Sequence, residues 1–195
     1  MRSVLVLQRI SGLLELLSDR ILAWDALVLE RVSSSPLLRR FDALFLLATY
    51  LGDGYIWGLF GLWLIFAGGP RDHHNVLVSL GVAVVQLSLV KILKLFFRRE
   101  RPPVFVPARR VFIFDSHAFP SGHATLAFGM ATATLRLYPE WYGLILLAFI
   151  LASVISLSRV YLREHYPLDV VGGVILGTIS AWILAPVFQN TIPWG

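Results

Sequence analysis

The 195-residue sequence contains no cysteine and few charged residues, which make up 15% of the chain. The absence of cysteine excludes disulfide bonds and thiolate metal sites. The charged fraction lies well below the roughly 25% usual for soluble globular domains, whereas 57% of the residues are hydrophobic and the mean hydropathy is +0.73. This composition indicates an integral membrane protein. The chain also lacks a Gly-, Ser- or Pro-rich linker and an internal repeat, so we expect one membrane-embedded domain over residues 1–195.

The sequence has fewer acidic than basic residues, 12 against 17, and the formal net charge is +5. A basic chain can bind nucleic acid, but here the arginines gather around residues 98–110 and form no basic face with interleaved aromatic residues. We therefore expect no nucleic-acid partner. A membrane surface or an anionic substrate explains the positive charge better.

Long apolar runs are abundant. A helix that spans a bilayer needs about 20 mostly apolar residues, and fewer where protein shields its ends. Five stretches meet this condition, namely 54–68, 75–97, 123–137, 141–160 and 168–188. They predict an all-α, polytopic helical bundle.

Residues 1–50 carry charges too often for an ordinary span. One helical stripe there collects polar and small residues, namely Gln8, Ser11, Gly12, Glu15, Ser18 and Asp19. This pattern indicates an amphipathic helix that lies in the membrane interface or packs on the bundle. It leaves open whether a sixth crossing lies in this region.

Alternating crossings place the loops 98–122 and 161–167 on one membrane face, and the loops 69–74 and 138–140 on the other. The loops on the first face hold more arginines than those on the other, which has little beyond Arg71 and Arg136. The positive-inside rule would therefore make the first face cytoplasmic. That inference fails if a binding site holds these arginines. Three polar clusters fall on this same face.

The first cluster is "KLFFRRERPP", in which Lys94 and Arg101 are seven residues apart and therefore share one stripe of a helix that Pro102 ends. The pair can bind an anion, or its cations can snorkel at a helix end. The second cluster is "PSGH". There Ser121 can cap a helix, Gly122 leaves room for an anion at the helix N-terminus, and His123 can exchange a proton. Simple capping beside an interfacial histidine is the alternative.

The third cluster, "SRVYLREHYPLD", contains His165 four residues before Asp169, close enough for the carboxylate to fix the imidazole tautomer. A histidine held in this way acts as a nucleophile or a base. Ordinary helix-start chemistry also accounts for Asp169. We predict that Arg163 and Glu164 are solvated partners.

Zinc is an alternative ligand for two histidines and an aspartate. Several arginines on the same face make a dication unfavourable and favour a phosphate, whose oxygens arginine can clamp in bidentate fashion. We therefore expect neither a metal nor another cofactor.

Together the clusters resemble the signature motifs of the type-2 phosphatidic acid phosphatase superfamily of membrane lipid phosphatases. Within residues 94–169 the pattern KxxxxxxRP is met by Lys94, Arg101 and Pro102, PSGH by residues 120–123, and SRxxxxxHxxxD by Ser158, Arg159, His165 and Asp169. The stretch "YLGDG" at 50–54 also resembles one found upstream in bacterial members.

The resemblance implies about six transmembrane helices and a metal-independent phosphatase. In this family pattern His165 would attack phosphorus to form a phosphohistidine, Asp169 would orient it, and His123 would protonate the leaving group and later activate water. The phosphate oxygens would be held by Lys94, Arg101, Ser121, Gly122 and Arg159. The resemblance also implies a site on the periplasmic face of a bacterial inner membrane.

The sequence leaves the substrate and the oligomeric state open. Relatives of this size use phosphatidylglycerophosphate, undecaprenyl pyrophosphate, phosphatidate or the 1-phosphate of lipid A. The loop at 103–119, with Arg109, Arg110 and His117, is the expected lid or headgroup reader. The alternative function is a catalytically silent protein that binds or transports a lipid phosphate on the same scaffold.

Overall fold

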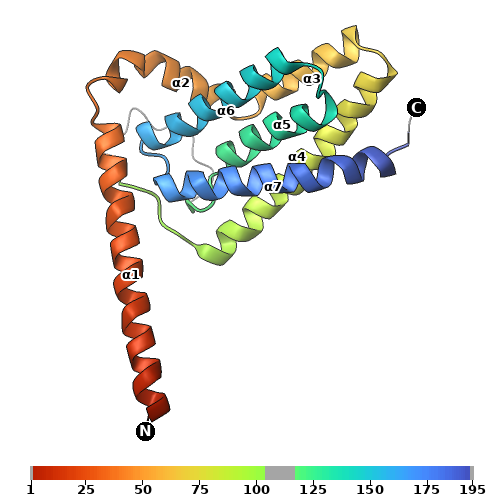
Figure 1. Ribbon diagram of the computed structural model, residues 1–195. Helices are drawn as coiled ribbons and strands as arrows, with labels where there is room; N and C mark the ends of the chain where they lie inside the picture. The colour runs from red at the N-terminus through yellow and green to blue at the C-terminus, as the bar shows by residue number, and fades with distance from the viewer. Residues whose placement is uncertain (1, 104–116, 194–195) are drawn as a thin grey trace.

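The computed structural model describes residues 2–103 and 117–193, with side chains from residue 11 onward. These residues form an all-α bundle, as predicted (Figure 1). The elements are α1 (Arg2–Ser33), the 3-10 helix η1 (Leu38–Phe41), α2 (Asp42–Leu51), α3 (Tyr55–Ala67), α4 (Pro70–Phe97), α5 (Gly122–Leu137), α6 (Tyr142–Tyr161) and α7 (Pro167–Thr191).

The five predicted spans coincide with α3 to α7 to within a few residues at most ends. Three described helices, α4, α6 and α7, are each long and apolar enough to cross a membrane. A fourth crossing results if η1, α2 and α3 form one span bent by 60°. The predicted count of about six stays a prediction.

Helix α5 has only 16 residues, yet most of its side chains are buried. It lies at the centre of the bundle, packed mainly on α7 and also on α6 and α4 (Figure 1). Its contact with α7 is close because α7 presents glycines there: a Cβ atom at Gly177 would lie 2.2 Å from the Thr125 carbonyl oxygen. Small residues allow such an approach of helix backbones within a membrane.

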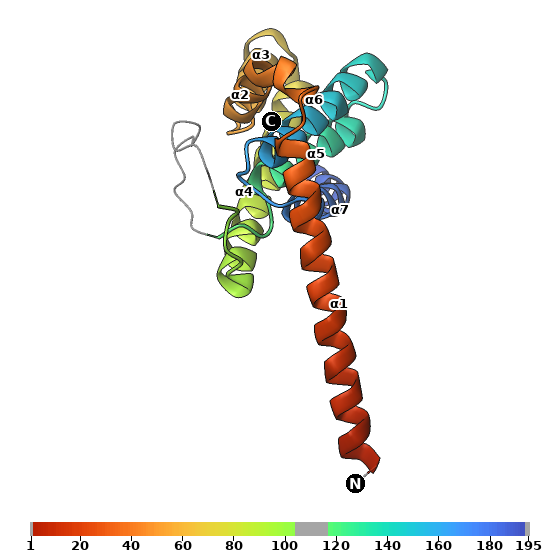
Figure 2. The same ribbon diagram turned by 90° about the vertical axis from the view of Figure 1, so that its left-hand side faces the viewer.

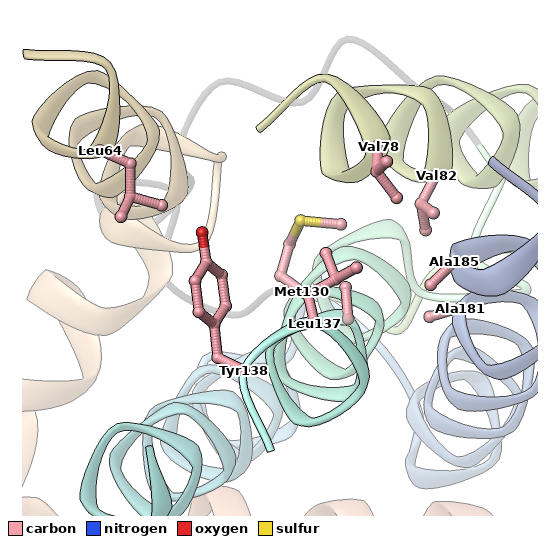
Figure 3. Packing of buried hydrophobic residues seen from close by; sticks show 9 residues of the cluster. Leu64, Val78, Val82, Met130, Leu137, Tyr138, Ala181 and Ala185 are labelled. Carbon is pink, nitrogen blue, oxygen red and sulfur yellow. The ribbon is translucent and has the colours of Figure 1, made fainter. Parts of the chain in front are cut away.

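Buried side chains fill the bundle on both sides of this contact. Leu64 of α3, Val78 and Val82 of α4, and Met130 of α5 belong to one apolar cluster (Figure 3). Within the bundle, the buried Gln86 amide of α4 donates hydrogen bonds to the Gly177 carbonyl (3.0 Å) and the Ser180 hydroxyl (2.9 Å). These bonds fix α4 against α7, because an unpaired amide is costly in an apolar environment.

The loops sort to the two ends of the bundle as the crossing pattern predicts. At one end Arg71 forms an ion pair with Glu140 (2.7 Å), and the Tyr138 hydroxyl donates to Asp72 (3.0 Å). At the other end the Ser121 amide donates to the Asp169 carbonyl at 2.9 Å. The three signature motifs meet at this second end.

Helix α1 extends away from the bundle (Figures 1 and 2). Every side chain from Ser11 to Trp24 is exposed, including the described part of the predicted polar stripe. Among the side chains of α1 that the structure describes, those that pack on the bundle lie near its C-terminal end, where Asp25 and Leu29 are buried. An interfacial position for the exposed part stays a prediction.

The α5–α7 contact can be tested with Gly177→Ala. The added methyl group must displace the backbone of α5, so we expect the free energy of unfolding to fall by about 1–3 kcal/mol. Gly143→Ala is the matched control, since a Cβ atom there meets nothing within 4 Å. The free energy of unfolding, measured by denaturation in detergent, should be unchanged or slightly higher for this control. An equal change in both variants would contradict the proposed packing.

Candidate active site

The predicted site residues come together at one end of the bundle. Lys94 lies on the last turn of α4, Ser121 precedes α5, Arg159 lies on the last turn of α6, and Asp169 lies in the first turn of α7. All four are buried, as is His165. The structure thus assembles the three motifs from helix termini, where the chain leaves free backbone groups and can place polar side chains next to one another.

His165 is almost fully buried in the loop that joins α6 to α7. Its Nδ1 atom lies 3.6 Å from Asp169 Oδ2, and its Nε2 atom lies 3.5 Å from the Arg101 guanidinium. Burial, followed by the positive charges of Arg159, Arg101 and Lys94, lowers the pKa of His165 well below its usual value. The imidazole is therefore neutral at neutral pH and keeps a nitrogen lone pair for nucleophilic attack.

Each carboxylate oxygen of Asp169 accepts a hydrogen bond. Its Oδ2 atom accepts a hydrogen bond from the Tyr166 amide (2.9 Å), and its Oδ1 atom accepts one from Arg99 (2.7 Å). The first of these bonds satisfies a free amide at the start of α7. The carboxylate therefore stands in a fixed position behind the imidazole.

Glu164 is buried and serves as the counter-charge of the arginines. Arg101 donates to its backbone carbonyl (3.0 Å) and lies 3.4 Å from its Oε2 atom, and Arg159 lies 3.7 Å from the same oxygen. The prediction of a solvated side chain was wrong for Glu164, whereas Arg163 is half-buried and pairs with an exposed glutamate. Arg163 pairs with Glu30 of α1 at 2.8 Å, and Glu164 is buried because two neighbouring guanidinium groups need a paired carboxylate.

His123 has a carboxylate partner that the sequence analysis missed. Its Nε2 atom lies 2.7 Å from Oδ1 of Asp53, in the turn between α2 and α3. The charge of Arg159 acts on both His123 and His165, so the two imidazoles face one cationic region. The only sequence signal for Asp53 is the "YLGDG" stretch, which resembles one found in bacterial members of the family.

Several buried polar atoms in this region lack a hydrogen-bond partner, namely the donors Ser121 Oγ and Arg159 Nε and also Glu164 Oε1 and His165 Nδ1. Ser121 stands at the N-cap position of α5, but its side chain makes no capping bond. Gly122 follows, and a Cβ atom there would meet only Val90 at an ordinary 3.6 Å. Packing does not require this glycine, whereas an anion at the helix N-terminus benefits from the open backbone. Unsatisfied buried donors of this kind fit the oxygens of a phosphate.

The predicted lid loop is described only at its ends, and Arg109 and Arg110 lie outside the described residues. The two ends are joined by a bridge between Glu100 and His117 and by a hydrogen bond from the Ala118 amide to the Arg99 carbonyl (2.8 Å). In the part of the chain that the structure covers, no three His, Asp or Glu side chains form a metal-binding group. Cations surround His165 instead, and such surroundings suit an anion.

Comparison with known proteins identifies the family of the chain. Residues 75–193 match the sequence model of the PAP2 superfamily. The chain belongs to the PAP2 superfamily. The resemblance drawn from the three motifs is thereby confirmed, and with it the expectation of a membrane phosphatase.

Individual relatives support this assignment. The chain is 30% identical to undecaprenyl-diphosphatase of Sulfolobus acidocaldarius, over 78% of the chain and 72% of the relative. It is 42% identical to the putative undecaprenyl-diphosphatase YbjG of Escherichia coli, but this match covers only 37% of the chain and 35% of that protein. Among solved structures, Aquifex aeolicus LpxE is similar with a TM-score of 0.67 and 27% identity, over 82% of this chain and 93% of LpxE.

The phosphatidylglycerolphosphate phosphatase of Bacillus subtilis shares the fold, with a TM-score of 0.66 and 24% identity over 89% of this chain and 88% of that one.

Proposed function

We propose that this protein hydrolyses the phosphate monoester or pyrophosphate of a lipid headgroup through a phosphohistidine at His165, without a metal. The observation that carries the proposal is the buried His165, with Asp169 behind one ring nitrogen and Arg101 beside the other. This is the arrangement of an oriented nucleophile next to an anion site.

In the first step the His165 Nε2 lone pair forms a bond to phosphorus while the bond to the leaving oxygen breaks. His123 donates a proton to this oxygen. Lys94, Arg101 and Arg159, with the Ser121 hydroxyl and the Gly122 backbone, hold the phosphoryl oxygens as charge builds on them. Asp169 stabilises the positive charge that the imidazole acquires.

In the second step water attacks the phosphohistidine. His123, now neutral, takes a proton from this water, and the N–P bond breaks to return His165 to its neutral form. Asp53 accepts a hydrogen bond from His123 and so orients its ring in both steps. Each proton and each electron pair is returned, so the cycle needs no cofactor.

An apolar cavity supports a lipid as the leaving group. It has a volume of about 670 Å³ and is lined by α3, α4 and α5. Asp53, which contacts His123, lines one part, while Leu137 and Tyr138 at the opposite end of the bundle line another. A hydrocarbon chain in this cavity would place its headgroup beside His123.

The names of two relatives support a prenyl lipid as the substrate. Undecaprenyl-diphosphatase of S. acidocaldarius and decaprenylphosphoryl-5-phosphoribose phosphatase of Mycobacterium tuberculosis, 36% identical over 61% of this chain and 68% of that protein, are both named for prenyl lipids. We therefore place undecaprenyl pyrophosphate first, ahead of phosphatidylglycerophosphate, phosphatidate and the 1-phosphate of lipid A.

We also propose a position in a bacterial inner membrane, with the site on the periplasmic face. The positive-inside rule counts arginines of loops. Here Arg99, Arg101 and Arg159 pair with buried carboxylates, and Arg163 pairs with Glu30, so these arginines serve the fold and the site. Their number consequently does not argue for a cytoplasmic face.

The test is phosphate release from purified protein in detergent, with a chelator present, for each of the four lipids. We expect release from at least one of them, and fastest release from the prenyl substrate. Loss of release on chelation would contradict the metal-free mechanism. Binding of these lipids without any turnover would support the silent binding or transport protein instead.

A further inference from the structure

We infer that Asp25 of α1 and Arg99 are positioning residues for the catalytic pair, acting through Asp169. This inference rests on the proposed function. Arg99 follows the end of α4 and bridges two buried carboxylates: one guanidinium nitrogen lies 2.5 Å from Asp25 Oδ2, and the other lies 2.7 Å from Asp169 Oδ1. Both aspartates are fully buried.

Asp25 also binds the backbone that carries Asp169. Its second oxygen accepts a hydrogen bond from the Leu168 amide at 2.9 Å. This amide belongs to the first turn of α7, where the helix itself supplies no acceptor. Asp25 therefore caps α7 from another helix, one residue before the carboxylate that faces His165.

Arg99 is held by a third contact, because its guanidinium lies over the ring of Tyr166 at 4.5 Å from the centroid. Tyr166 precedes α7 and follows His165. Although burial lowers the pKa of Arg99, hydrogen bonds to Asp25 and the charges of both aspartates raise it overall, so the group stays cationic. The planar fork of arginine matches two carboxylates at once, which the single ammonium of lysine does not.

The electrostatic consequence concerns the charge on Asp169. If Arg99 paired with Asp169 alone, it would neutralise much of the negative charge that the carboxylate offers to His165. Asp25 shares the guanidinium, so Asp169 is held in place and still carries charge toward the imidazole. Packing alone would explain a buried ion pair, but it does not explain why the bridge ends on the carboxylate behind the nucleophile.

The experiment measures kcat and KM for phosphate release by the full-length Asp25→Asn variant in detergent. We expect kcat to fall about tenfold to 100-fold, as for other residues that orient a functional group, with KM within about twofold. Glu30→Gln is the matched control, because Glu30 also joins α1 to the bundle through an arginine but contacts no site residue. It should leave kcat unchanged.

Asp25→Asn is then combined with Asp169→Asn. If Asp25 acts through Asp169, kcat of the double variant is no lower than that of Asp169→Asn alone. The inference would be overturned if the losses of kcat in the two single variants were fully additive, or if kcat of Asp25→Asn were unchanged. Thermal unfolding shows whether each variant is folded. Should Asp25→Asn not fold, Arg99→Lys takes its place in the same cycle. An inactive wild-type protein would refute the proposed function, whereas an active wild type with an unaffected variant would refute only this inference.

Discussion

His165→Asn is expected to reduce phosphate release by about 10⁴-fold or more, the scale of loss when a nucleophile is removed. Asparagine fills much of the buried space but has no lone pair that can attack phosphorus. The measurement is phosphate release from purified protein in detergent, together with thermal unfolding to show that the variant is folded. His73→Asn is the matched control, because His73 is exposed and lies at the other end of α4.

A chemical trap separates nucleophilic attack from base catalysis. The wild type, quenched during turnover, should carry a phosphoryl group that is stable to alkali and labile to acid, as expected of an N–P bond, and His165→Asn should carry none. A variant that still releases phosphate at the wild-type rate would rule out this nucleophile. If His165 acted as a base, His165→Asn would also be inactive, but the quenched wild type would carry no phosphoryl group.

Apolar runs predicted the helices well because burial in a membrane is a property of local composition. The runs at 75–97 and 168–188 correspond to α4 and α7, and the shorter run at 123–137 forms α5 because its neighbours shield it. That the three motifs meet at one end of the bundle was also predictable, since the alternation of crossings places their loops on one membrane face.

The partners of these residues were not predictable from local patterns. Asp53 contacts His123 from the turn before α3, and Asp25 reaches Arg99 from a helix that otherwise leaves the bundle. Glu164 was predicted to be solvated because its neighbours in the sequence are charged. It is buried because its neighbours in space are Arg101 and Arg159. Ion pairs between distant segments depend on how the helices pack, and no short stretch of the chain specifies that packing.

His123→Asn should slow release from a lipid substrate by about 10²- to 10⁴-fold, the usual contribution of a general acid or base. The loss comes from the first step, because a lipid alkoxide leaves poorly without a proton. The phenolate of a soluble aryl phosphate leaves without protonation. The rate of the first step with this substrate should therefore be largely unchanged in the variant. Its second step still lacks the base, and phosphohistidine should accumulate.

Pre-steady-state kinetics of His123→Asn with the aryl phosphate should therefore show a burst of about one phenolate per protein, followed by slow turnover. The wild type should show a smaller burst, because water attack keeps pace, and His165→Asn should show none. Equal losses with both substrates and no burst in His123→Asn would mean that this histidine only binds the phosphate. The contact at 2.7 Å between His123 and Asp53 would then position a phosphate-binding imidazole rather than one that transfers protons.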